Sequence, residues 1–237
     1  MRYLSHSSTT RSIKLAGLWR SALSIIFLAW CARLALAELD PAALQRNLVA
    51  RFGPARVVLL SDWLQTVNAA KTQGEDGKLK SKNKKKNRNI AFESDITIWQ
   101  QTDYWATPLE TIGQGRGDCE DFAIIKYVAL REAGIPTSKL RLVYVKATLE
   151  TRNGPMQQAH MVLAYYPTPN AEPLILDNLE STIRPATRRS DLQPVFSFNS
   201  EGIFAGAAGK DKATGGGLGR LSRWEDALRR IRAEGFE

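Results

Sequence analysis

One cysteine in the middle of the chain stands where a helix is predicted to begin. Cys119 follows a glycine-rich approach and precedes an apolar pattern, from Phe122 to Leu130, that is typical of a buried helix. Free backbone N–H groups and the positive end of the helix dipole favour negative charge at such a position. They lower the pKa of a cysteine there and can also bind the oxyanion of a tetrahedral intermediate. Cys119 is therefore our candidate nucleophile.

A nucleophilic cysteine needs a base and a group that orients the base. His160 opens a predicted strand downstream of Cys119, and the other histidine of the chain is His6, near the N-terminus. Asp177 ends the next predicted strand, where an antiparallel neighbour would lie beside the start of the first. Asp191 is a second candidate for orienting the histidine, in a less regular region further along. We expect Cys119, His160 and Asp177 to act as nucleophile, general base and orienting carboxylate.

The acids that flank Cys119 act against its activation. Asp118, Glu120 and Asp121 raise the pKa of a neighbouring thiol by like-charge repulsion. One interpretation is that they are helix N-terminal acids, which the dipole favours. The other is that some of them bind a hard divalent cation, with Ca²⁺ favoured by oxygen ligands, so that the ion neutralises the repulsion. Zinc is disfavoured because the chain after residue 37 contains one cysteine and one histidine.

The first 37 residues have the layout of a secretory signal peptide. Basic residues precede an apolar run over residues 21–32, and small residues precede an expected cleavage site after Ala37. An uncleaved anchor helix is the alternative, but the apolar run is short for a bilayer and Arg33 interrupts its end. Cleavage lowers the formal net charge from +9 to +4 and leaves Cys119 without a disulfide partner. An unpaired cysteine in an exported protein is either a reactive thiol or a buried structural residue.

The rest of the chain predicts one α+β domain over residues 38–237, with helices first and an antiparallel sheet after the Cys119 helix. Hydrophobic residues make up 43% and charged residues 24%, which excludes wholesale disorder. The lysine-rich residues 72–89 are expected to form a solvated surface loop, and residues 205–219 a glycine-rich link. No aromatic residues interleave with the lysines, which disfavours nucleic acid as a partner. The expected helices are 41–53, 54–70, 90–104, 119–133 and 222–234, and the expected strands are 140–148, 160–166 and 173–176.

Five ordered blocks around these residues resemble the bacterial transglutaminase-like cysteine proteinases, and within that family the LapG-type periplasmic proteases. The resemblance covers roughly residues 91–204, and the order of the blocks makes it specific. The blocks are Asp103-Tyr104-Trp105-Ala106-Thr107-Pro108, Gly117-Asp118-Cys119-Glu120-Asp121, Ala159-His160-Met161-Val162-Leu163, Leu176-Asp177-Asn178, and Asp191-Leu192-Gln193-Pro194-Val195 with Phe198-Asn199.

The resemblance implies a papain/transglutaminase-like fold and a Cys-His-Asp triad, which falls on Cys119, His160 and Asp177. It also implies dependence on Ca²⁺ through acids beside the cysteine, which are Asp118 and Glu120 here. Substrates in the family are large surface adhesins, cut near their N-termini at a pair of alanines so that the adhesin is released and the biofilm disperses. An inner-membrane receptor that senses cyclic di-GMP typically sequesters such a protease through its periplasmic domain. We therefore expect a calcium-dependent periplasmic cysteine endopeptidase.

Two other functions remain open. An acyl transferase of the transglutaminase type uses the same triad and differs in whether water or an amine resolves the thioester, which nothing local to Cys119 decides. A non-catalytic, calcium-stabilised binding module would carry a vestigial triad, and the retained single cysteine and histidine count against it. The lysine-rich segment and the glycine-rich link depart from the family pattern and bear on partner docking rather than on the triad.

Overall fold

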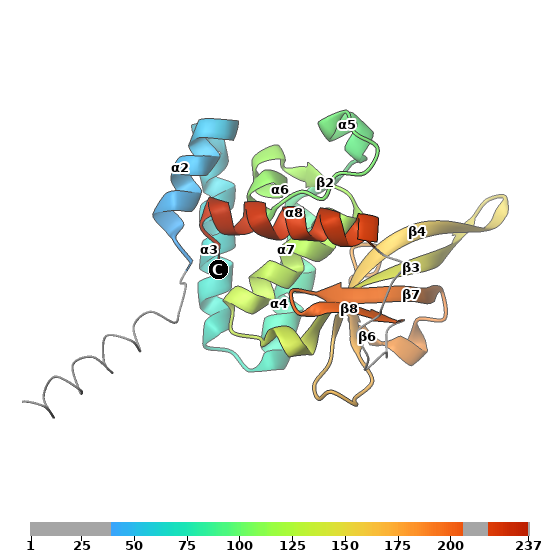
Figure 1. The fold of residues 1–237 in the computed structure, drawn as a ribbon. Coiled ribbons are helices and arrows are strands. Elements are labelled where there is room, and N and C mark those ends of the chain that lie inside the picture. The colour runs from blue at the N-terminus through green and yellow to red at the C-terminus, as the bar shows by residue number, and fades with distance from the viewer. Residues whose placement is uncertain (1–38, 206–217, 237) are drawn as a thin grey trace, which may run out of the picture. The chain divides into compact units, whose positions relative to one another are not determined.

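The computed structural model describes residues 39–205 and 218–236. The predicted signal peptide and most of the glycine-rich link lie outside these residues. Helices precede a sheet, as the sequence predicts (Figure 1). The helices are α2 (Pro41–Phe52), α3 (Val57–Lys71), α4 (Glu75–Asn89), α5 (Asp95–Trp99), α6 (Pro108–Gln114), α7 (Cys119–Glu132) and α8 (Leu218–Glu234), with 3₁₀ turns at Pro54–Arg56, Thr137–Lys139 and Ala186–Arg188. Among the described residues, no helix has the length and apolar character needed to cross a membrane.

The sheet has six strands, and every neighbouring pair in it is antiparallel. The strands are β3 (Leu140–Thr151), β4 (Gly154–Tyr165), β5 (Leu174–Leu176), β6 (Arg184–Pro185), β7 (Leu192–Asn199) and β8 (Gly202–Ala205). Their order in the sheet is β6-β5-β4-β3-β7-β8, so β4 lies inside the sheet between β3 and β5. Leu163 of β4 pairs with Leu176 of β5, which brings the residue after β5 beside β4. The sequence predicted the first part of β3, the second half of β4 and β5, but not β6, β7 or β8.

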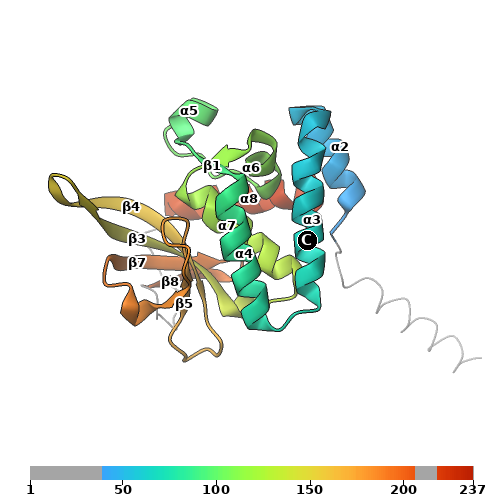
Figure 2. The ribbon, with the colours of Figure 1, turned by 180° about the vertical axis from the view of Figure 1, so that it is seen from behind.

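Helix α7 lies at the centre of the helical layer. It packs on β4, with α8 on one side and α4 on the other, as the two opposite views show (Figures 1 and 2). Ile124 and Ile125 are fully buried, and the ring of Tyr127 meets the ring of Trp224 in α8 edge-on, at 5.5 Å between centroids. Each fully buried side chain of this size contributes about 1.5–3 kcal/mol. The helix that begins at Cys119 is therefore a rigid support.

The expected helix over residues 90–104 is wrong except at α5. Ala91 and Phe92 instead form β1, which pairs with β2 (Arg116–Gly117) in a parallel two-stranded ladder. Helix α5 ends at Trp99, and the next residue, Gln100, has a left-handed backbone with φ of 56°. The backbone of this segment thus finds partners outside a local helix, in a stretch 25 residues further along.

The approach to Cys119 is more ordered than its glycines predict. Residues before it form helix α6, where the Thr107 side chain and Glu110 make a capping box and Pro108 takes the first turn. A Cβ on Gly113 would lie 2.3 Å from the ring of Phe52. Gly113 therefore permits close contact between α6 and α2 rather than flexibility.

The lysine-rich residues 72–89, expected to form a surface loop, contain helix α4. Leu79 is 1% exposed, Glu75 accepts hydrogen bonds from Lys139 Nζ (2.8 Å) and the Tyr165 hydroxyl, and Asn83 Nδ2 donates to the carbonyl of Ser181 (2.8 Å). Lysine is a good helix former, so a polar composition does not prevent a helix once a few side chains dock on the fold. The expectation failed because those docking partners are distant in sequence.

Helix α7 also buries a lysine. Lys126 is 1% exposed, although burying an ammonium group is costly. Burial lowers the pKa of Lys126 to about 7, and the carboxylate of Asp177 opposes this shift. In the unfolded chain the lysine keeps its proton to much higher pH, so the folded and unfolded states bind different numbers of protons above pH 7.

We expect Leu79→Ala to lower the free energy of unfolding by about 2–5 kcal/mol, because it empties a buried site under α4. The exposed neighbour provides a control, since Lys80→Ala should change stability by no more than about 0.5 kcal/mol. Urea denaturation followed by circular dichroism measures both variants. Equal stabilities of the two variants would mean that α4 is not docked on the fold.

We expect the stability of the wild type relative to Lys126→Met to rise between pH 7 and pH 9. In that window the unfolded wild type binds a proton that the folded state does not, so raising the pH favours folding. Urea denaturation at pH 7, 8 and 9 measures the difference, with the exposed Lys80→Met as a control whose difference should stay flat. A difference for Lys126→Met that does not change with pH would contradict a depressed lysine pKa.

Candidate active site

Cys119 is the first residue of α7, as predicted, and Asp118 occupies the cap position before it. The thiol donates to Glu120 Oε2 at 2.7 Å, and the backbone N–H of Met161 in β4 points to the sulfur. Met161 directly follows His160. The thiol of Cys119 therefore lies beside the residue that follows the candidate base, His160, in β4.

Two opposing influences act on this thiol. Burial and the carboxylates of Glu120 and Asp118 raise the pKa of Cys119 well above its usual range, while the Met161 amide lowers it. The sequence expectation of like-charge repulsion is thus met by the geometry. A base, or positive charge near the flanking acids, would favour a thiolate at Cys119.

His160 and Asp177 form a buried pair. Each is 1% exposed, and His160 Nε2 donates to Asp177 Oδ1 at 2.8 Å. The same carboxylate oxygen accepts the backbone N–H of Leu179 at 3.1 Å. Because Nε2 is committed to the carboxylate, Nδ1 is the ring nitrogen left to exchange a proton with a nucleophile.

His160 lies in the middle of β4, opposite Val145, and not at the start of a strand as predicted. The strand begins at Gly154 because β3 and β4 continue pairing through polar residues at their outer ends. Asp177 directly follows β5, as expected, and it bonds the histidine. Asp191, the other candidate, is linked to this pair through Arg189.

A group of carboxylates gathers at the start of α7. Ligand oxygens of Asp95, Asp118 and Asp121 lie within 4.8 Å of one another, and Asp118 forms a second such group with Cys119 and Glu120. Sequence reasoning singled out Asp118 and Glu120 as ligands but missed Asp95. Its only sequence signal was an acid within the expected helix over residues 90–104, and the pairing of β1 with β2 brings α5, which begins at Asp95, to the site.

The chemistry of this cluster fits a hard cation. Oδ1 of Asp95 and Oδ1 of Asp118 are buried without hydrogen-bond partners. Burial, with the neighbouring acids, raises the pKa of Asp95 to about 6 and that of Asp118 to about 8. Asp121 is already committed, since it accepts the backbone N–H groups of Ala106 (2.8 Å) and Asp118 (3.4 Å). Buried oxygens of this kind, from carboxylates, are what Ca²⁺ prefers.

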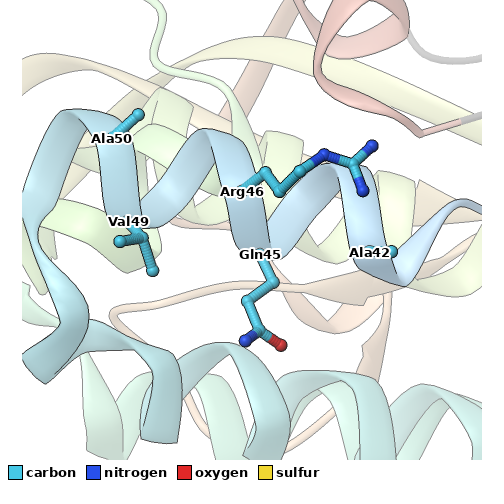
Figure 3. A pocket seen from close by; sticks show the side chains of 5 residues that line it. All are labelled: Ala42, Gln45, Arg46, Val49 and Ala50. Carbon is cyan, nitrogen blue, oxygen red and sulfur yellow. The ribbon is translucent and has the colours of Figure 1, made fainter.

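A pocket of about 540 Å³ lies elsewhere, on the surface of α2 (Figure 3). Its lining consists of Ala42, Gln45, Arg46, Val49 and Ala50, all from that one helix. None of these five described residues is an acid, a histidine or a cysteine. The chemistry-bearing residues of the described chain therefore meet at α7 and β4 and not at this pocket.

Comparison with known proteins agrees with this geometry. The family model for the bacterial transglutaminase-like cysteine proteinase BTLCP matches residues 62–191. No curated protein matches the chain. Among solved structures, LapG of Legionella pneumophila is 36% identical, with a TM-score of 0.66, and the match covers 82% of this chain and 98% of that chain.

Two further LapG structures from Legionella pneumophila match equally well. The calcium-bound form is 35% identical with a TM-score of 0.67, covering 81% of this chain and 99% of that one. The EGTA-treated form is 35% identical with a TM-score of 0.68, covering 82% and 98%. The α+β, transglutaminase-like fold expected from the sequence is thereby confirmed. The chain belongs to the family of bacterial transglutaminase-like cysteine proteinases.

Proposed function

We propose that this protein is a calcium-dependent cysteine endopeptidase with Cys119, His160 and Asp177 as its catalytic triad. The observation that carries the proposal is the buried His160–Asp177 hydrogen bond, with the thiol of Cys119 beside the next residue of the same strand. Membership in a cysteine proteinase family supports hydrolysis over acyl transfer to an amine.

The reaction follows from the positions of these groups. His160 Nδ1 takes the thiol proton, and Cys119 Sγ attacks the scissile carbonyl carbon to form a tetrahedral intermediate. Backbone N–H groups at the start of α7 stabilise the oxyanion. The histidine then gives its proton to the leaving amine, which leaves a thioester. Water resolves the thioester with His160 as base, and Asp177 holds the imidazole throughout.

Asp118 and Glu120, with Asp95 at the start of α5, are the residues that would hold calcium. Bound there, Ca²⁺ supplies positive charge that offsets the acids which raise the pKa of Cys119. The calcium-bound and EGTA-treated LapG structures support a calcium site in this fold. Asp121 keeps the loop at Ala106 attached to α7.

The biological setting completes the proposal. Residues 1–37 direct export, and the protease acts in the periplasm. Its substrate is the N-terminal region of a large surface adhesin, whose cleavage releases the adhesin and disperses biofilm, and a cyclic di-GMP receptor of the inner membrane sequesters the enzyme. The similarity to LapG supports this setting, which rests on the family resemblance rather than on particular side chains here.

We expect Cys119→Ala to reduce cleavage of the N-terminal adhesin region by at least about a thousandfold, because the nucleophile is lost. Gel electrophoresis and mass spectrometry of the fragments measure the rate and locate the cut. Lys80→Ala is the control, since it changes an exposed side chain outside the site and should keep full activity. Full activity of Cys119→Ala would eliminate the proposed nucleophile. Incorporation of a primary amine in place of hydrolysis would identify an acyl transferase.

We expect Asp118→Asn and Asp95→Asn each to weaken Ca²⁺ binding by about tenfold or more, because each removes a charged oxygen ligand. Titration calorimetry measures the affinity, and the calcium-dependent rise in melting temperature provides a readout independent of activity. The exposed Asp76→Asn is the control and should bind as the wild type does. Wild-type affinity in both site variants would leave these residues as helix-terminal acids.

A further inference from the structure

Asp177 is held on two sides, and the second partner is an arginine that the triad does not include. Arg189 is 7% exposed, and its Nη2 donates to Asp177 Oδ2 at 2.7 Å. His160 and the N–H of Leu179 occupy the other oxygen, Oδ1. The two carboxylate oxygens are thus assigned to different partners, which fixes the rotation of the carboxylate plane.

Arg189 is itself fixed. Its Nε donates to Asp191 Oδ1 at 2.9 Å and its Nη2 to Asp191 Oδ2 at 2.7 Å, a two-point contact that a planar guanidinium and a carboxylate make with little freedom. The carbonyl of Asp191 accepts the N–H of Thr148 in β3 at 2.8 Å. A chain of contacts therefore runs from the sheet through Asp191 and Arg189 to Asp177.

The charges explain why such a chain is useful. An aspartate buried in this way is costly unless it is paired, and the hydrogen bonds from His160 and Arg189 hold the pKa of Asp177 below its usual range. Lys126 of α7 is a second basic group that interacts with this aspartate, because the carboxylate of Asp177 opposes the lowering of the Lys126 pKa by burial. Asp177 therefore stays ionised as a fixed acceptor for His160 Nε2–H, which keeps Nδ1 directed away from it.

We propose that Arg189, anchored by Asp191, is a positioning residue that holds the carboxylate of Asp177 in line with His160. The role rests on the proposed cysteine protease function and extends the triad by two residues. Arg189 touches no reacting atom, so its effect passes through Asp177. The same stretch of chain offers a comparison, because Arg184 forms an exposed pair with Glu180 at 3.4 Å and has no contact with the triad among the described interactions.

The kinetic test compares Arg189→Ala, Arg189→Lys and Arg184→Ala in the full chain, with the adhesin region as substrate. We expect Arg189→Ala to lower kcat on the order of ten- to a hundredfold, the range seen when outer partners of a functional histidine are lost, with KM unchanged. Arg189→Lys restores the charge without the planar fork and should recover part of the rate. Arg184→Ala should match the wild type.

A spectroscopic test needs no substrate. A histidine ring N–H bonded to a buried carboxylate gives a slowly exchanging proton signal at low field, which His160→Ala assigns by its disappearance. We expect this signal to broaden or vanish in Arg189→Ala while it persists in Arg184→Ala. If the contacts of Arg189 only joined two loops, the signal would persist in Arg189→Ala.

Asp191→Asn covers the case in which Arg189→Ala does not fold, because Asp191 lies near the surface and its replacement keeps the side-chain shape. A loss of kcat and of the low-field signal, with an unchanged melting temperature, supports the proposal in any of these variants. Wild-type kcat and an intact signal in folded Arg189 and Asp191 variants would overturn it and leave proteolysis standing. If the wild type cleaves nothing, the proposed function fails, and the signal alone decides the positioning role.

Discussion

The buried carboxylate of Asp177 needs hydrogen-bond donors around it, and several elements of the surrounding structure supply them. An isolated carboxylate in a protein interior would take up a proton, and then it could not orient an imidazolium. Here the end of β5, the middle of β4 and the turn before β7 each bring one partner to it. The sheet order, with β4 between β3 and β5, is what makes these three contacts possible at once.

The thiol has the opposite surroundings. Cys119 stands at a helix N-terminus, which favours a thiolate, but burial and the carboxyl groups of Glu120 and Asp118 raise the pKa of its thiol, which donates a hydrogen bond to Glu120. The site thus combines a buried His160–Asp177 pair with a thiol whose pKa is raised by burial and by its acidic neighbours. The proposed cation at the carboxylate cluster and the proposed histidine base would both favour the thiolate. The arrangement therefore offers a physical reason for the calcium dependence that we propose.

The sequence predictions succeeded where an element depends on contacts close in the sequence, and they failed where it depends on contacts between distant residues. The start of α2 was predictable because Asp40 caps it and Pro41 follows, contacts that span three residues. The start of α7 at Cys119 was predictable for the same reason. Residues 72–89 were misjudged because Leu79 and Asn83 find their partners far along the chain. Residues 91 and 92 were misjudged because a parallel ladder with residues 116 and 117 outweighs a local helical pattern.

The sequence by itself determined the types of chemistry available after residue 37 and their order along the chain: one thiol at a helix start, one histidine in a strand and an aspartate directly after the next strand. Those features depend on residue identity and on periodicity, which are local. Only the tertiary structure decided that Asp177 and not Asp191 bonds His160, that Arg189 joins the two aspartates, and that Asp95 enters the carboxylate cluster. Such pairings arise from strand order and loop packing, where side chains many residues apart compete for one buried partner, and no local pattern encodes the outcome.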